Sequence, residues 1–253
     1  MRLKDKVAII TGSSKGIGLG IARAFAREGA KVVITSRHEE EGEAVAQALG
    51  SANRNAMYIR TDVTQPDDIT NMIDTTVATF GKLDILVNNA GYFIAKDAET
   101  LSQDEYEFLH NTNMRSTFLC CKFALPHLKK TRGNIINVSS MAGVAGFLAS
   151  AGYSPTKAGQ IALAKNIAID FGPHGVRANV ICPGYIRTPL SDDWFRQLEN
   201  DGTLMKEILD KHLVGRFGNI DDCGHAAVYL ASDEASFITG VVLHVDGGVT
   251  VGY

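Results

Sequence analysis

The sequence has little of what several classes of protein require. Its cysteines, Cys120, Cys121, Cys182 and Cys223, form no C-x-x-C pair, and neither they nor the scattered histidines show the spacing of a zinc site. Such cysteines are typical of small buried hydrophobic residues in a reducing compartment. We therefore expect neither a disulfide framework nor a metal centre.

Long apolar runs and a dominant charge are also missing. No run approaches the roughly 18 apolar residues of a membrane-spanning helix, and the short apolar run near the start is too brief for a signal peptide. The net charge of −3 gives no basic surface for nucleic acid or for an acidic membrane. These absences favour a cytoplasmic protein that acts without nucleic-acid or membrane partners.

Short apolar runs alternate with amphipathic stretches along the 253 residues. The runs are rich in Val, Ile and Leu, which is typical of strands buried on both faces of a parallel sheet. We predict one doubly wound α/β domain over residues 1–253, with helices on both faces of a seven-stranded sheet. The expected strands are 6–11, 31–36, 56–63, 83–91, 133–140, 175–184 and 240–248. The expected helices are 17–30, 39–49, 66–80, 102–130, 153–171, one or two within 188–213, and 220–232.

A glycine-rich turn, TGSSKGIG (11–18), follows the first expected strand. Gly12 permits a tight turn, Gly16 lets a phosphate approach the backbone, and Gly18 allows the next helix to pack closely on the sheet. The start of that helix offers free N–H groups and a positive potential to a pyrophosphate. The turn therefore predicts a dinucleotide site, although its spacing is G-x-x-x-G-x-G rather than the commoner G-x-G-x-x-G.

The end of the second expected strand distinguishes between the two nicotinamide cofactors. NAD-binding domains usually carry Asp or Glu there for the ribose 2′-hydroxyl, whereas this chain has Ser36 followed by Arg37, with Lys15 inside the glycine loop. Two cations without a carboxylate suit a 2′-phosphate, which arginine binds in a bidentate way. We predict NADP (NADPH) as the cofactor, with NAD as the alternative.

Tyr153 precedes Lys157 by four residues in AGYSPTKAG, which places both side chains on one face of a helix. A cation beside Tyr153, together with an oxidised nicotinamide, favours tyrosinate and is expected to lower the tyrosine pKa. Pro155 falls in the first turn, where a missing N–H costs little. This pair predicts a proton donor for carbonyl reduction.

Two further polar residues belong to the same chemistry. Ser140 ends a strand thirteen residues before Tyr153 and can donate a hydrogen bond to a substrate oxygen, while strand alternation turns Ser139 to the opposite face. Asn113 stands within a helical run, where asparagine is a poor helix former. The cost of that placement indicates a role for Asn113.

These residues, together with Asp62-Val63, Asn88-Asn89-Ala90-Gly91 and Pro183-Gly184, stand in the order and spacing of a known family. The chain resembles the short-chain dehydrogenase/reductase family over essentially its full length. The resemblance implies a Rossmann-type sheet, a nicotinamide cofactor, and hydride transfer between a carbonyl and a secondary alcohol, with Tyr153 as general acid/base.

The resemblance also implies roles for individual residues. Lys157 is expected to bind the nicotinamide ribose, and Asn113 to hold a water that links Lys157 to solvent. The implied catalytic residues are Asn113, Ser140, Tyr153 and Lys157. The implied cofactor-binding residues are Gly12, Ser14, Lys15, Gly16, Ile17, Gly18, Ser36, Arg37, Asp62, Val63, Asn89, Ala90, Gly91, Tyr153, Lys157, Pro183, Gly184, Ile186 and Thr188.

The substrate is expected against segments 92–97, 141–150 and 188–213, of which the last, with Trp194 and Phe195, has the composition of a lid. The apolar content of the first two segments favours a small-molecule carbonyl or alcohol with some hydrophobic surface. NAD-linked sugar and polyol dehydrogenases of the family have similar PGYIRTP stretches, so polar substrates stay open.

Three other expectations accompany this interpretation. A 3-oxoacyl-carrier-protein reductase is the alternative within the family, with Lys129, Lys130 and Arg132 available to an acidic carrier, although YFIAKD lacks the Thr-Arg-Asp usual there. A regulator that has lost catalysis is disfavoured because the catalytic set is intact. The resemblance implies a homotetramer, with helices 102–130 and 153–171 at one interface and the region near VDGG at another.

Overall fold

The seven expected strands form one parallel sheet in a computed structural model that describes residues 1–50 and 55–251. The strands are β1 (Val7–Ile10), β2 (Lys31–Ser36), β3 (Ala56–Arg60), β4 (Ile85–Asn88), β5 (Asn134–Val138), β6 (Arg177–Pro183) and β7 (Val242–Val245). Their order is β3-β2-β1-β4-β5-β6-β7, which confirms the predicted fold class. The order reverses between β1 and β4, and ligands of such sheets bind in the crevice that opens there.

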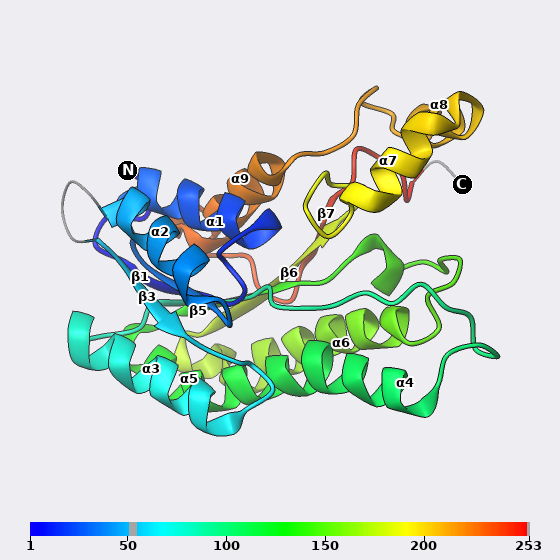
Figure 1. Cartoon of the computed structure of the whole chain (residues 1–253). Coiled ribbons are helices and arrows are strands. Elements are labelled where there is room, and N and C mark those ends of the chain that lie inside the picture. Colours follow the sequence, from blue (N-terminus) through cyan, green and yellow to red (C-terminus); the bar gives the residue numbers. More distant parts are fainter. Residues whose placement is uncertain (51–54, 252–253) are drawn as a thin grey trace.

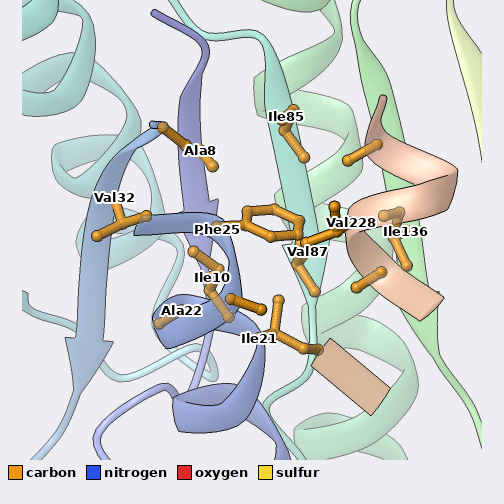
Figure 2. Close-up of a cluster of buried hydrophobic side chains, with 14 of the residues drawn as sticks. Ala8, Ile10, Ile21, Ala22, Phe25, Val32, Ile85, Val87, Ile136 and Val228 are labelled. Atoms are coloured by element: carbon orange, nitrogen blue, oxygen red, sulfur yellow. The ribbon is translucent and has the colours of Figure 1, made fainter. Parts of the chain in front are cut away.

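Helices cover both faces of the sheet (Figure 1). One face carries α1 (Gly16–Arg27), α2 (Glu39–Gly50) and α9 (Ile220–Ala231), and the other carries α3 (Pro66–Phe80), α5 (Ser116–Thr131) and α6 (Tyr153–Phe171). Figure 2 shows Phe25 of α1 among side chains of the central strands and beside Val228 of α9. Because Phe25 is fully buried, truncating it to alanine is expected to cost about 3–5 kcal/mol of stability.

The expected helical stretch over 102–130 is confirmed, and a π-helical turn divides it. The structure has α4 (Gln103–Leu109), a π-helical turn (His110–Arg115), and then α5. Asn113 lies in the π-helical turn, where its side-chain amide bonds to the main chain of Tyr92. A π-helical turn widens the helix locally and is frequent at functional sites.

Several expected strands are also too long, because their last residues leave the sheet. Residues 61–63 and 89–91 follow β3 and β4 as loops at the carboxyl edge. The stretch 188–213 contains α7 (Asp192–Asn200) and α8 (Gly202–Asp210), which extend beyond the end of β6 (Figure 1). Short 3₁₀ turns lie at Met141–Gly143, Gly172–His174 and Asp233–Ala235.

Two expectations concern the whole chain. The predicted domain spans residues 1–253, of which 51–54 and 252–253 lie outside the described residues. A search of the described helices for one that could cross a membrane, by length and apolar content, finds none.

Candidate active site

A cleft of about 440 Å³ opens at the carboxyl edge of the sheet. The glycine loop forms one end of this cleft, and Tyr153 and Lys157 lie at the other. Of the predicted cofactor-binding residues, those that line it are Gly12, Ser14, Lys15, Gly16, Ile17, Ser36, Arg37, Asp62, Val63, Asn89, Ala90, Gly91, Tyr153, Lys157 and Thr188. Tyr92, Pro189 and Leu190 in the same lining belong to the predicted substrate segments 92–97 and 188–213. The residues that the sequence analysis did not name are His38, Thr61, Thr64, Phe108, Thr112 and Val138.

Four predicted cofactor residues lie outside that lining. Gly18 packs beneath the loop, since a Cβ there would stand 2.5 Å from the carbonyl oxygen of Gly12. Pro183 ends β6, and Gly184 packs against Asp246. Ile186 is buried in the core, where its side chain packs against Gly218. The close packing at Gly18 is what its place in the glycine motif predicted, whereas Pro183, Gly184 and Ile186 were chosen from the family pattern.

The glycine loop has the shape of a phosphate cradle. Gly12 and Gly16 have φ of +63° and +59°, in the region that disfavours side chains, and a Cβ on Gly12 would stand 3.0 Å from Ala90 Cα. Helix α1 begins at this loop without a side-chain cap and without an acidic residue in its first turn. Its first N–H groups and positive end are therefore available to an anion, which fits the pyrophosphate of a dinucleotide.

Asn89 holds this loop in place rather than facing the cleft with its amide. Its Nδ2 donates to the carbonyl oxygens of Thr11 at 2.8 Å and Gly12 at 3.0 Å. The hydroxyl of Thr11 in turn accepts from the main-chain N–H groups of Asn89 and Ala90. The loops after β1 and β4 are thereby bound together at the point where the strand order reverses.

The expectation of two cations without a carboxylate is wrong at the ribose end. Glu41, in the first turn of α2, places Oε2 3.8 Å from Lys15 Nζ and accepts from the Ser14 hydroxyl at 3.4 Å. Acidic residues favour the first turn of a helix, so its position in α2 was the signal available in the sequence. Arg37 lines the same end of the cleft, and the hydroxyl of Ser36 donates to the carbonyl of His38.

The side chains of Tyr153, Ser140 and Lys157 meet at the other end. The Ser140 side chain lies near enough to Tyr153 to act on the pKa of its phenol, and Lys157 Nζ lies 5.5 Å from the centre of the tyrosine ring. Burial raises the pKa of Tyr153 to about 12 in the free protein, and the Ser140 side chain only partly opposes this. The predicted lowering concerns the protein with oxidised nicotinamide bound and stays a prediction. Burial likewise lowers the pKa of Lys157 to about 8.

The two serines follow the end of β5 and make different contacts, but the predicted turning of Ser139 away from the site is wrong. The Ser139 hydroxyl donates to the main-chain oxygen of Lys157 at 2.8 Å, which ties β5 to the first turns of α6. The Ser140 hydroxyl accepts from the N–H of Ala142 at 3.1 Å and starts the 3₁₀ turn that follows. Ser139 also lines the cleft, which the alternation argument did not predict.

Asn113 is fully buried and its side-chain amide is engaged. Its Oδ1 accepts from the N–H of Tyr92 at 2.8 Å, and its Nδ2 donates to Tyr92 O and Thr156 Oγ1. These bonds join the segment after β4 to the start of α6. The residue therefore holds together two of the segments that carry the catalytic pair.

Aromatic rings gather at the substrate end. Tyr185 stacks on Trp194 of α7 with ring centres 5.1 Å apart, and it also contacts Phe147 and His212. Phe93 packs edge-on against Tyr153 at 5.0 Å. The three segments predicted to form substrate walls thus each contribute a ring to this end of the molecule.

No three His, Cys, Asp or Glu side chains among the described residues form a group that could hold a metal ion.

Comparison with known proteins gives consistent results over the whole chain. A family model described as enoyl-(acyl carrier protein) reductase matches residues 12–250. An L-fucose dehydrogenase of Oryctolagus cuniculus is 42% identical over 253 residues, which cover 99% of this chain and 87% of that protein. A 3-alpha-(or 20-beta)-hydroxysteroid dehydrogenase of Mycobacterium tuberculosis is 39% identical over 252 residues, covering 99% of this chain and 92% of that protein.

Solved structures agree with this assignment. A gluconate 5-dehydrogenase from Burkholderia cenocepacia, solved in complex with NADP and tartrate, superposes with a TM-score of 0.93 at 32% identity, covering 100% of this chain and 98% of that one. The named relatives are dehydrogenases, and this chain is likewise an oxidoreductase that acts on CH–OH or C=O groups. The chain belongs to the short-chain dehydrogenase/reductase family.

Proposed function

We propose that the protein interconverts a secondary alcohol and a carbonyl compound with NADP(H), using Tyr153 as the general acid/base. One observation carries this proposal. Tyr153 and Lys157 line one end of a cleft, with the Ser140 side chain next to Tyr153, and the glycine cradle and Arg37 form the other end. The glycine loop would hold the pyrophosphate of a bound dinucleotide, and Tyr153 would supply the proton at the other end of the same cleft.

The chemistry divides between the cofactor and the chain. When bound, the nicotinamide supplies the hydride for reduction or accepts it in oxidation. The Ser140 hydroxyl holds the substrate oxygen, and the Tyr153 phenol donates its proton to that oxygen as negative charge develops. Lys157 places a cation beside the phenol and favours its ionised form.

Cofactor preference rests on Arg37 and Lys15. Arg37 lines the ribose end of the cleft, and a guanidinium binds a phosphate through paired hydrogen bonds. Lys15 lines the same cleft, is about half exposed, and forms an ion pair with Glu41. We assign NADP on the strength of Arg37, with the carboxylate of Glu41 opposing that preference, and NAD remains the alternative cofactor.

The substrate we propose is a secondary alcohol, or the corresponding ketone, on a ring. Three relatives are named as dehydrogenases of ring alcohols: L-fucose, a hydroxysteroid and trans-4-hydroxycyclohexanecarboxylate. In this chain Phe147, Tyr185 and Trp194 provide flat apolar surfaces at the substrate end, and such surfaces suit the face of a ring. We further propose that 188–213 acts as the substrate lid.

Acyl carrier protein is a less suitable partner for this site. Lys129 and Lys130 end α5, which runs back from the carboxyl edge of the sheet to the amino edge, and Arg132 follows them there. Helix α5 has 16 residues and spans about 24 Å. A carrier bound to these cations would dock on the edge opposite to Tyr153.

The remaining proposals follow the family resemblance. We propose one domain, a cytoplasmic location, and a homotetramer assembled through α4–α6 and through the region around β7. Sedimentation of the purified protein tests the oligomeric state.

A panel of ring alcohols and ketones, assayed with NADPH and NADH, tests the activity and the cofactor together. We expect turnover of a ring substrate with NADPH at higher kcat/KM than with NADH. The Arg37→Ala variant is expected to lose about tenfold or more in kcat/KM with NADPH and little with NADH. Equal or better kcat/KM with NADH in the unmodified protein would overturn the cofactor assignment.

A further inference from the structure

A second cavity lies at the amino edge of the sheet, opposite to the catalytic cleft. Its volume is about 510 Å³, and its walls are the starts of β4, β5 and β6, the end of α5, and the turn that joins α6 to β6. Pockets that hold small organic molecules have volumes of about 300–1,000 Å³. The cavity is therefore large enough for a ligand of its own, and it shares no lining residue with the catalytic cleft.

The charged side chains of this lining are mainly basic. They are Lys6, Asp84, Arg132, Arg177 and Asp233. The carboxylate of Asp84 is neutralised by Lys82, whose Nζ lies 2.9 Å from its Oδ2. The side chain of Asp233 is 91% exposed and pairs with Lys6 at 3.7 Å. The positive charge left over in the cavity therefore belongs to the two arginines.

Arg177 is half buried at the start of β6. Its guanidinium donates to the main-chain oxygens of Ile238 at 3.2 Å and Ser232 at 3.3 Å. Of the described carboxylates only Asp233 acts on it, through space and without an ion pair, and burial lowers the pKa of Arg177. A cation that has lost part of its water and gained only carbonyl dipoles is stabilised further by an anion. An arginine has five N–H donors, so these two bonds leave others for a ligand.

Arg132 occupies a position that usually favours glycine. It follows α5 with φ of +53°, a left-handed conformation that is unfavourable for a side chain and is commonly taken by glycine at the end of a helix. Its side chain lies over Gly175, where a Cβ would stand 2.9 Å from Arg132 Nε. The glycine thus leaves room for the arginine beside the cavity. None of the described side chains pairs with this guanidinium.

The two arginines belong to neighbouring segments of main chain. The N–H of Arg177 donates at 3.1 Å to the oxygen of Gly133, the residue after Arg132. Thr239 completes the polar lining, since its Oγ1 accepts from the N–H of Ala178 at 3.1 Å and keeps its own hydrogen to donate. A guanidinium binds a phosphate through paired hydrogen bonds, and the oxygens and double charge of a phosphate suit two guanidiniums.

We propose that this cavity is a second anion site, which binds the phosphate group of a small organic molecule between Arg132 and Arg177. The site lies at the opposite edge of the sheet from Tyr153, so its ligand takes no part in hydride or proton transfer. A bound phosphate joins the end of α5, the start of β6 and the segment before β7. It therefore stabilises the folded chain, as does any ligand that binds the folded state alone.

Isothermal titration calorimetry with inorganic phosphate tests this proposal. The protein is first saturated with NADPH, or with NADH if that is the cofactor which binds, so that the glycine cradle is filled. Ionic strength is held constant with sodium chloride. We expect phosphate still to bind, at one per chain. Acetate is titrated in parallel and should bind at least about tenfold more weakly, because a carboxylate offers fewer oxygens and less charge.

Arg132→Gln and Lys129→Gln form a matched pair of variants. Each removes one positive charge at the amino edge, and only Arg132 lines the cavity. Arg132→Gln is expected to weaken phosphate binding by about tenfold or more, since it loses hydrogen bonds to a charged group. Lys129→Gln should change the Kd by less than about twofold, because exposed charges are screened. Arg177→Gln should weaken binding as Arg132→Gln does, and if Arg177→Gln fails to fold, Arg132→Gln decides.

The absence of phosphate binding to the cofactor-saturated protein would overturn the proposal. So would an unchanged Kd in Arg132→Gln, or an equal loss in Arg132→Gln and Lys129→Gln. Acetate binding as tightly as phosphate would overturn the assignment to a phosphate group. Turnover of Arg132→Gln should match that of the unmodified protein, whereas the proposed function is tested separately by Tyr153→Phe.

Discussion

Lys15 Nζ lies 3.8 Å from Glu41 Oε2, at the end of the cleft where the adenosine ribose of a dinucleotide is expected. Both side chains are about half exposed, so the pair contributes at most about 1 kcal/mol to stability. The charges of this pair matter for the choice between NADP and NAD. A 2′-phosphate gains from Lys15 and Arg37, and it loses from the nearby charge of Glu41.

Replacing Glu41 with glutamine is therefore expected to strengthen the preference for NADPH. Removing one exposed like charge is worth about 1 kcal/mol, or about fivefold in kcat/KM with NADPH. Kinetics with both cofactors measure the change, and Glu39→Gln in the same helical turn is the control. A large loss with NADH instead would mean that Glu41 binds the ribose hydroxyl of NAD, against our assignment.

The buried lysine predicts a pH-dependent stability. Burial lowers the pKa of Lys157 to about 8, below its value in the unfolded chain, so the unfolded state holds the proton to higher pH. Stability is then expected to rise from about pH 8 to about pH 10, by up to about 1.4 kcal/mol per pH unit.

Urea unfolding across that range, with Lys157→Met as the control, checks this expectation. The control should lack the rise, because its side chain carries no proton. Parallel curves for the two proteins would contradict the lowered pKa of the buried Lys157 ammonium. Above about pH 10 the raised pKa of Tyr153 acts in the opposite direction, since the folded state then holds the extra proton.

The cysteines are expected to be chemically inert in the folded protein. Cys120, Cys121, Cys182 and Cys223 are all buried with free thiols. Burial raises the pKa of Cys121 and of Cys223 to about 12, so few thiolates form near neutral pH. An aromatic disulfide reagent should titrate all four thiols in denaturant and none in the native protein, and a fast native reaction would contradict the packing.

Trp194 is expected to act on substrate binding alone. Trp194 stacks on Tyr185, and the proposed substrate would add a further aromatic contact, which is worth about 0.5–1.5 kcal/mol beyond burial. Trp194→Ala should raise KM for a ring substrate by about fivefold to tenfold and leave the Kd for NADPH unchanged. Equal weakening of both would show that α7 supports the cofactor instead.

The sequence predicted the sheet well because its strands are continuous apolar runs, and α3 and α6 were predicted to the residue. The π-helical turn at Asn113 was not predicted, and the partner of the Asn113 amide, the main chain of Tyr92, is distant in the sequence. Glu41 was missed for a similar reason, since its proximity to Lys15 follows from how α2 packs after β2. The residues at the end of β2 show no carboxylate, and the one near Lys15 comes from α2, which follows β2.

The contacts of Gln160 could not be predicted from the sequence either. A glutamine one turn after Lys157 is visible in the sequence, but its bonds depend on three elements meeting, and only the structure brings Asn113 and Thr117 to it. The pKa of Tyr153 also needed the structure. Spacing showed that Lys157 lies nearby, whereas burial sets the direction of the shift in the free protein.

The most direct measurement is the turnover of Tyr153→Phe. The variant keeps the ring that packs on Phe93 and loses only the hydroxyl, so the fold and the cradle are preserved. We expect kcat to fall at least about 100-fold, because general acid catalysis contributes that much, while NADPH binds with nearly unchanged Kd. Near-normal turnover by Tyr153→Phe would contradict the account.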